Sequence, residues 1–132
     1  MNRQEVDLYV CRADGAYLWN AESNVLKRVS DKDLRGFTGR MGNPENFALV
    51  APAVLVYVVD FERQGMQQRP QDAFKYACVD CGFIGQNVYL HAASAGLRTV
   101  FLGMINQQEL SAGLGLAGKR EPIFAQAVGH AK

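Results

Sequence analysis

A pair of cysteines near the middle of the sequence is the first candidate for chemistry. Cys78 and Cys81 form a C-x-x-C motif. In thiol oxidoreductases this motif lies at a helix N-terminus, where the helix dipole lowers the thiol pKa. Here the pattern places both cysteines about two turns inside a predicted helix, residues 71–95. We therefore interpret them as small apolar packing residues, and a thiol redox protein is the least favoured of three functional hypotheses.

Few other side chains suggest catalysis or metal binding. The two histidines, His91 and His130, lack the spacing of metal ligands, and no second cysteine pair could complete a zinc site. We interpret His91 as a structural residue rather than a catalyst. No Ser/His/Asp set or pair of carboxylates can be assembled, and the glycines in 36–42 and 113–115 lack the strand–turn–helix context of a phosphate-binding loop. The sequence thus predicts neither a catalytic side chain nor a metal site.

Length and composition fit a single domain over residues 1–132, with 48% apolar and 20% charged residues. The net charge is +1, and the Lys and Arg residues are scattered, which argues against nucleic acid or a membrane as partner. Three cysteines without a framework spacing favour a reducing compartment. The first residues carry no apolar segment typical of a signal peptide. We therefore expect a cytoplasmic protein.

Hydrophobic patterning predicts strands and helices in alternation. Alternating β-formers indicate an antiparallel meander over 6–11, 16–19 and 25–29, and Ser30 with Asp33 indicates a short helix that ends near Gly36. After it we expect a central strand covered on both faces at 53–61 and a long helix at 71–95, between Pro70 and Gly96. A strand at 98–105, a short helix at 107–113 capped by Asn106 and Glu109, and a last strand at 122–128 follow. This order predicts a mixed α/β layer architecture in which helices cover a sheet.

The long helix is apolar almost all round, which is typical of a helix buried in a large assembly. Its small residues lie in rows, with Ala77, Cys81 and Gly85 at a spacing of four and Cys78 and Gly82 beside them. Rows of small side chains let two helix backbones approach closely. Packing within one chain is the alternative, but we favour a homodimer interface along this helix.

Several stretches, taken together, are more specific than any one motif. They are DCGFIGQNVYL (80–90), AASAGL (92–97), TV (99–100) with Gly103, LGL (114–116) and AVG (127–129). This combination resembles the C-terminal half of the nitroreductase-like FMN flavoproteins. The earlier stretches LYV (8–10), GAYL (15–18) with Leu26, and APA (51–53) resemble the branch that includes azoline-peptide dehydrogenases.

The resemblance implies an α+β fold with a mixed, largely antiparallel sheet covered by helices. It also implies an obligate homodimer with FMN at its interface, reduced by NADH or NADPH. Hydride would pass from flavin N5 to a small organic acceptor such as a nitroaromatic, a quinone or an enone, so that no protein acid or base is indispensable. The family's Asn-x-Gln element matches Asn2, Arg3 and Gln4, and its backbone stretch over the flavin matches Leu102, Gly103 and Met104. These six residues are the expected cofactor-binding residues.

One part of the family pattern is missing. Family members begin with a helix whose Arg-Arg-Ser-type motif holds the FMN phosphate, and nothing here matches that motif. The chain therefore resembles a nitroreductase-like domain that is truncated at its N-terminus. Loss of charge-assisted hydrogen bonds worth about 1.5–3 kcal/mol each would weaken FMN binding. The alternative function is consequently a truncated or degenerate module that dimerises without catalysis.

Overall fold

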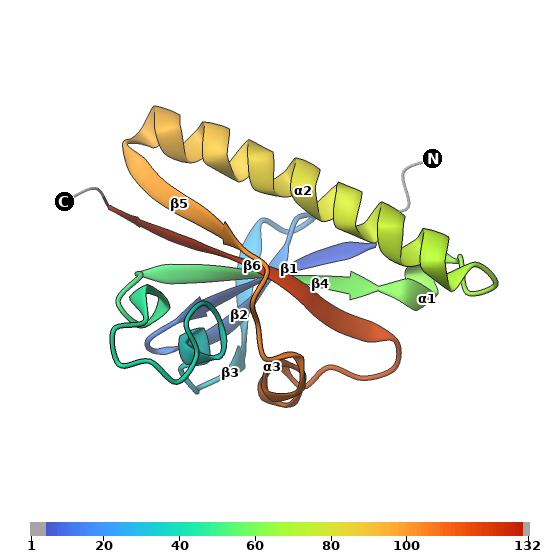
Figure 1. Ribbon diagram of the computed structural model, residues 1–132, viewed down its shortest axis with the longest axis horizontal. Coiled ribbons are helices and arrows are strands. Elements are labelled where there is room, and N and C mark those ends of the chain that lie inside the picture. The colour runs from blue at the N-terminus through green and yellow to red at the C-terminus, as the bar shows by residue number, and fades with distance from the viewer. Residues whose placement is uncertain (1–4, 131–132) are drawn as a thin grey trace.

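The computed structural model describes residues 5–130, which form six antiparallel strands and their connecting helices (Figure 1). The order across the sheet is β3-β2-β1-β4-β6-β5. The strands are β1 (Val6–Arg12), β2 (Gly15–Asn20), β3 (Val25–Ser30), β4 (Ala53–Asp60), β5 (Leu97–Leu102) and β6 (Arg120–His130). The helices are α1 (Phe61–Gln64), α2 (Pro70–Ala95) and α3 (Gln107–Leu114), with 3-10 turns η1 (Arg35–Phe37) and η2 (Phe47–Leu49). The predicted α+β fold with one long helix is confirmed.

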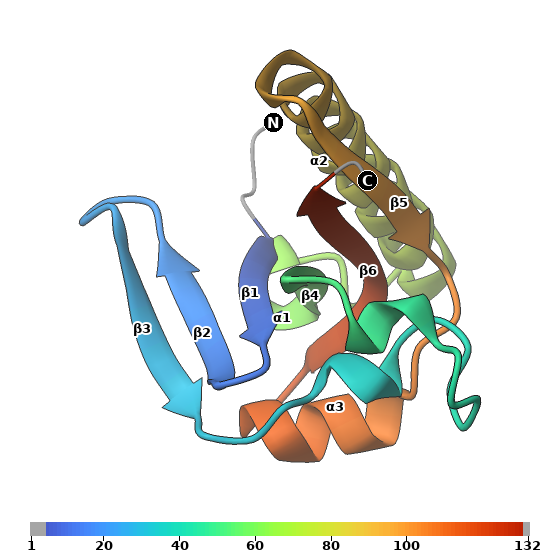
Figure 2. The same ribbon diagram turned by 90° about the vertical axis from the view of Figure 1, so that its left-hand side faces the viewer.

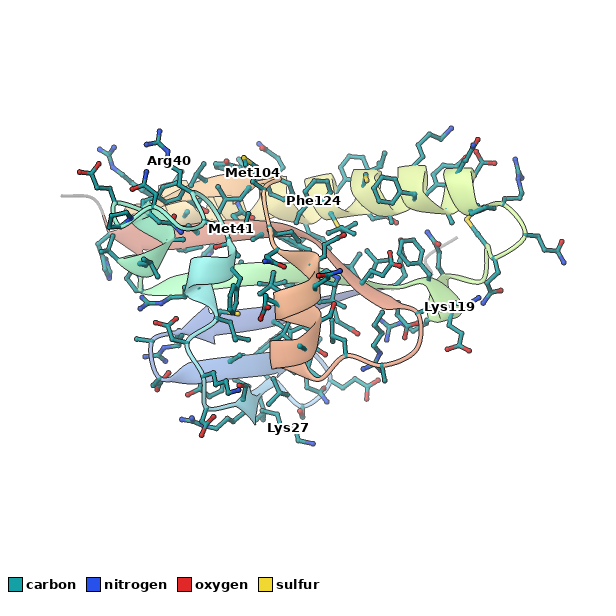
Figure 3. All side chains as sticks on the ribbon, turned by 60° about the horizontal axis from the view of Figure 1, so that its bottom comes forward. Lys27, Arg40, Met41, Met104, Lys119 and Phe124 are labelled. Carbon is teal, nitrogen blue, oxygen red and sulfur yellow. The ribbon has the colours of Figure 1, made fainter. Side chains whose placement is uncertain are left out.

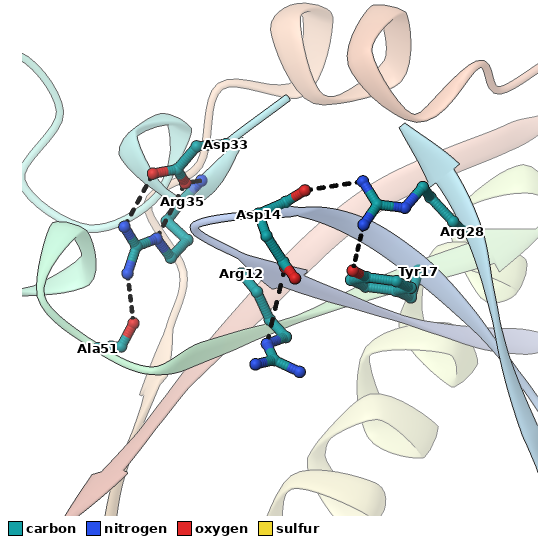
Figure 4. A network of polar contacts seen from close by, with 7 residues as sticks. All are labelled: Arg12, Asp14, Tyr17, Arg28, Asp33, Arg35 and Ala51. Atoms are coloured by element: carbon teal, nitrogen blue, oxygen red, sulfur yellow. Dashed lines mark hydrogen bonds and ion pairs between the residues drawn. The ribbon is translucent and has the colours of Figure 1, made fainter. Parts of the chain in front are cut away.

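The predicted meander of β1, β2 and β3 is confirmed, but the short helix predicted after Ser30 is wrong. The Ser30 hydroxyl accepts a hydrogen bond from the Lys32 N–H at 3.1 Å, which forms a local turn and no helix cap. The only helical turn nearby is η1, because Arg35 is held on both sides: its guanidinium pairs with Asp33 at 2.8 Å and donates to the Ala51 carbonyl at 2.7 Å (Figure 4). The chain then becomes extended at Thr38.

Strand β4 is the centre of the core, as its continuous β-branched sequence predicts. It lies between β1 and β6, with Val54, Val56, Tyr57, Val58 and Val59 fully buried. On one face, Val56 is in register with Tyr9 of β1 and Ala125 of β6, and α3 with the η1–η2 segment covers this layer. On the other face, Tyr57 packs against α2. Both faces of the central strand are therefore covered by its own chain.

Helix α2 begins and ends where the sequence predicts. Pro70 occupies its first turn, and Gly96 caps its C-terminus in the left-handed conformation with a φ of 73°. We expected the row of small residues on α2 to face a partner subunit, but it faces the sheet of the same chain. Ala77, Cys81 and Gly85 are buried against the sheet of the same chain, so this row is not a free dimer surface. Small residues are needed here because α2 lies close to the sheet: a Cβ on Gly85 would lie 2.7 Å from the Phe101 ring.

The C-terminal elements mostly follow the expected pattern. The Asn106 side chain accepts a hydrogen bond from the Glu109 N–H at 3.1 Å and so caps α3, which ends at a left-handed Gly115. Strand β5 ends at Leu102, three residues before the predicted end, because Ile105 leaves the sheet to form a bridge with Thr38. Strand β6 is longer than predicted and pairs with both β4 and β5. No helix within residues 5–130 is long and apolar enough to cross a membrane.

The cysteines are packing residues, as the sequence analysis favours. All three are free thiols; Cys11 and Cys81 are fully buried, and Cys78 is half-buried. Burial raises the pKa of both Cys11 and Cys81 to about 12 and also raises the pKa of Cys78. A redox-active thiol needs the opposite shift. The positions of Cys78 and Cys81 inside α2 therefore speak against thiol chemistry.

Two glycines of α2 provide a matched test of its packing. Overpacking costs about 1–3 kcal/mol, whereas replacing a helical glycine by alanine gains about 1 kcal/mol. The Gly85 position has the Phe101 ring at 2.7 Å, and the Gly82 position is open to at least 4 Å. We expect Gly82→Ala to raise the free energy of unfolding measured in urea. The free energy of unfolding of Gly85→Ala should be about 1–3 kcal/mol lower than that of Gly82→Ala. Equal stability of the two variants would contradict this packing.

Thiol reactivity tests the burial of the cysteines. The thiolate is the reacting form, so a pKa near 12 leaves Cys11 and Cys81 almost entirely protonated at pH 8. We expect a thiol reagent to modify only Cys78 in the folded protein, and slowly, and all three cysteines in denaturant. Absorbance of the released chromophore measures both steps. Rapid modification of Cys81 in the folded state would contradict its burial and would support the thiol redox hypothesis.

Candidate functional site

The segment after β5 is fixed in place by hydrogen bonds from the loop that follows η1. The Gly39 N–H donates to the Met104 carbonyl at 3.1 Å, and the Asn106 N–H donates to the Phe37 carbonyl at 2.8 Å. Between them, Thr38 and Ile105 form an antiparallel bridge. Two segments far apart in the sequence thus form a small extra ladder beside the main sheet. Residues 103–106 are held by main-chain contacts, so their path depends little on their own side chains.

A buried asparagine that no sequence motif marks holds this loop. Asn46 donates from its side-chain nitrogen to the Thr38 carbonyl at 2.8 Å, and its side-chain oxygen accepts from the Arg40 N–H at 3.1 Å. Gly39 has a φ of 71°, and a Cβ there would lie 2.7 Å from the Asn46 oxygen. The glycine-rich stretch 36–42 is the only sequence signal for this arrangement. It indicates a loop and does not show what the loop contacts.

A hollow of about 530 Å³ lies beside residue 103. Its described lining residues are Met41, Gly103, Ile105, Asn106, Gln107, Gln108 and Ile123, and none of these is charged. A Cβ added to Gly103 would meet nothing within 4 Å, so the protein's own packing does not require glycine there. Arg40, Met41 and Met104 project toward the same edge of the molecule in Figure 3, and the Met104 side chain is exposed. At this edge the main chain is accessible and lies next to apolar and amide side chains.

The hollow and the open backbone at Gly103 fit the ring of a flavin better than its phosphate. An isoalloxazine ring is flat and uncharged, and the open backbone at Gly103 and Met104 gives it room to approach. The phosphate of FMN is dianionic and binds most strongly to Lys or Arg, and the described lining of the hollow includes neither. Arg40 is adjacent to Met41 in the chain and is exposed. The hollow therefore suits the ring, and any cationic contact to the phosphate would come from outside its described lining.

The predicted site residues are distributed unevenly over the structure. Gly103 lines the hollow, Met104 is exposed beside it, and Leu102 packs against the core at the end of β5. Asn2, Arg3 and Gln4 lie outside the described residues. His91 is exposed on α2. Within residues 5–130 no group of His, Cys, Asp or Glu is arranged to hold a metal ion.

The outer face of α2 is a second surface that could take part in the site. Large apolar side chains are exposed there, with Phe83 at 68% and Leu90 at 60% accessibility. Tyr76 and Val79 are also exposed, so the four apolar positions follow one another at spacings of three, four and seven. This spacing is typical of a helix face that packs against another helix. We call Tyr76, Val79, Phe83 and Leu90 the outer seam; it lies opposite the buried row of small residues.

Comparison with known proteins places these features in a family. Residues 1–130 match the Nitroreductase family. A Methanocaldococcus jannaschii protein provisionally named a nitroreductase is 28% identical over 117 residues, covering 89% of this chain and 58% of the relative. A Ralstonia eutropha crystal structure, also provisionally named a nitroreductase, is 30% identical with a TM-score of 0.83, covering 97% of this chain and 59% of that protein.

Two further solved structures are similar over different lengths. The microcin synthetase McbBCD complex of Escherichia coli contains a chain with a TM-score of 0.82 at 18% identity, covering 98% of this chain and 53% of that one; it shares the fold. The NADPH:FMN oxidoreductase of Vibrio harveyi has a TM-score of 0.55 at 26% identity, covering 65% of this chain and 40% of that enzyme.

The chain spans less than three fifths of the length of the first two relatives. The match nevertheless covers almost every residue of this protein, including the long helix, the strand after it and the segment at Gly103. Sequence and fold agree, and the resemblance read from the stretches between residues 80 and 129 is confirmed. The protein belongs to the nitroreductase family.

Proposed function

We propose that this protein is an FMN-dependent NAD(P)H oxidoreductase whose flavin ring lies on the main chain of Gly103 and Met104. The observation that carries the proposal is the open backbone at Gly103 beside an uncharged hollow, in a chain of the nitroreductase family. The similarity to an NADPH:FMN oxidoreductase supports the choice of cofactor. Bound FMN would supply hydride transfer from its N5 atom.

The chain itself would position the ring and exclude water from it. Hydrogen bonds from Gly39 and Asn106 fix the backbone on either side of Met104, so the ring would meet a preorganised surface. Leu102 would anchor the start of this segment in the core, and Asn2, Arg3 and Gln4 would contact the flavin from the other end of the chain. No side chain of the protein need act as an acid or base.

The described lining of the hollow contains no Lys or Arg for the phosphate of FMN, and we propose that a second copy completes the site. The outer seam supports a homodimer, because four large apolar side chains on one helix face would otherwise stay in water. The proposed dimer interface is therefore the outer face of α2. It lies opposite the row of small residues, which was the interface expected from the sequence. The proposed acceptor is a small organic molecule of the nitroaromatic, quinone or enone-like class, and the donor is NADH or NADPH.

A second candidate is a flavoprotein-fold module that dimerises without catalysis. The uncharged lining of the hollow favours it, since FMN without phosphate contacts would bind weakly. Both candidates share the seam and the fold. We also infer a reducing, cytoplasmic location, which the free thiols of Cys11, Cys78 and Cys81 support.

A glycine substitution tests the flavin site directly. Gly103→Val should keep the fold, because its Cβ has open space, but should fill the hollow and weaken FMN binding at least about tenfold. Quenching of flavin fluorescence during titration measures the affinity, and Ala117→Val on an exposed loop is the matched control. Unchanged affinity of Gly103→Val would contradict the placement of the ring. A wild-type protein that neither carries flavin nor binds added FMN would favour the non-catalytic module.

A charge placed in the outer seam tests the dimer. Phe83→Glu and Leu90→Glu each put a carboxylate where the proposal buries an apolar side chain, so sedimentation should show monomers where the wild type is a dimer. Circular dichroism should be unchanged, because neither side chain contributes to the core. Val25→Glu, at another exposed apolar position on β3, should remain a dimer. Dimeric Phe83→Glu and Leu90→Glu proteins would place the interface elsewhere.

A further inference from the structure

An arginine beside the hollow at Gly103 has no partner among residues 5–130. Most of the described arginines make an ion pair or a hydrogen bond within the chain: Arg12, Arg28, Arg35, Arg63, Arg69 and Arg120. In the same part of the chain the Arg40 guanidinium makes neither contact, and its side chain is exposed. A guanidinium that is not engaged by its own chain can bind the carboxylate of a ligand through two parallel hydrogen bonds.

The main chain places Arg40 beside the proposed position of the flavin ring. Gly39, the residue before it, donates its N–H to the Met104 carbonyl at 3.1 Å, and Met41, the residue after it, lines the hollow. Consecutive Cα atoms are about 3.8 Å apart, so the Arg40 side chain starts within one residue of both contacts. Figure 2 shows the loop between η1 and η2 side by side with the connection from β5 to α3.

The backbone of Arg40 is fixed, although its side chain is exposed. Its N–H donates to the side-chain oxygen of the buried Asn46 at 3.1 Å, and its carbonyl accepts from the Asn43 N–H at 3.1 Å. This second bond closes a turn whose third residue, Gly42, has a left-handed φ of 78°, which is typical of a type II turn. The side chains of Arg40 and Met41 therefore leave the loop from defined positions, and Figure 3 shows both projecting toward the same edge of the molecule.

The side chains at this edge combine two thioethers with one cation. Met41 and Met104 are both exposed, and Met104 has 70% of its surface accessible. Methionine sulfur makes favourable contacts with aromatic rings. The described lining of the hollow carries no charge, so the charge that this loop adds is the Arg40 guanidinium. An aromatic molecule with one carboxylate matches both kinds of group.

We propose that Arg40 selects the electron acceptor by its charge: the acceptor is a flat aromatic molecule whose ring lies beside Met41 and Met104 and whose carboxylate binds Arg40. The inference rests on the proposed function, since it places the acceptor next to a flavin ring at Gly103. The FMN phosphate is the other anion that Arg40 could bind. A ribityl chain separates that phosphate from the ring, whereas Gly39 holds the Arg40 loop against Met104, where the ring is proposed to lie. The position of Arg40 therefore favours the acceptor.

Two ligands of nearly the same shape test the recognition of charge. Both para-nitrobenzoate and para-nitrobenzamide are flat nitroaromatics, and only the first is an anion at neutral pH. The change in the visible flavin spectrum during titration measures the dissociation constant of each ligand for the oxidised, FMN-loaded protein. We expect the wild type to bind the benzoate at least about tenfold more tightly than the benzamide, and we expect added salt to reduce this ratio.

Variants assign the recognition to one side chain. Arg40→Gln should bring the two dissociation constants close to each other, and Arg40→Lys should keep part of the difference, because it keeps the charge and loses the planar fork. Lys119→Gln is the matched control: it removes the same charge from an exposed residue that lies at the opposite end of the molecule from Arg40 in Figure 3. Its preference for the benzoate should equal that of the wild type.

Flavin titrations separate this inference from the proposed function. Quenching of flavin fluorescence gives the affinities of the wild type and Arg40→Gln for FMN and for riboflavin, which lacks the phosphate, and we expect the same FMN-to-riboflavin ratio in both proteins. A lower ratio in Arg40→Gln would assign Arg40 to the phosphate and overturn the inference. So would a preference for the benzoate that Arg40→Gln retains while it binds FMN normally. A wild type that binds neither flavin would contradict the proposed function, and the inference would fail with it.

Discussion

The close approach of α2 to the sheet is the constraint on which the other features depend. Gly85 makes it possible, and a buried polar contact marks the place: the Tyr57 hydroxyl donates to the Gln126 side chain, whose nitrogen donates to the Gly85 carbonyl at 3.2 Å. The Phe101 ring lies between Tyr57 and Phe124 and allows no extra atom at Gly85. Because the small residues of α2 face inward, its large apolar residues must face outward. The outer seam follows from this orientation.

The candidate site depends on a different part of the same architecture. Strand β5 pairs with β6 only as far as Leu102, and the chain then crosses to a loop held by Asn46. The described residues around this junction present main chain and uncharged side chains. Such a surface suits chemistry that a cofactor performs and the protein orients. In the proposed function, the cationic contacts to the FMN phosphate would come from a second copy of the chain.

Much of the fold could be predicted from local signals. The turn residues of the meander, the continuous run in β4 and the Pro70 and Gly96 boundaries of α2 each reflect a preference of the backbone near that residue. The direction of the row through Cys81 could not be predicted, since small residues fit a partner helix and the chain's own sheet equally well. The anchoring of Met104 by Gly39 was also out of reach, because it joins segments more than sixty residues apart. Long-range packing decides both.

The central claim is that two copies joined through α2 hold a flavin ring over the main chain at Gly103. The most direct measurement is a titration of FMN at protein concentrations above and below the dimer dissociation constant, with flavin fluorescence and sedimentation recorded on the same samples. We expect quenching of flavin fluorescence only where dimers are present, and we expect FMN in turn to strengthen the dimer. Saturable quenching by a protein that stays monomeric, or dimers that leave the flavin fluorescence unchanged, would contradict it.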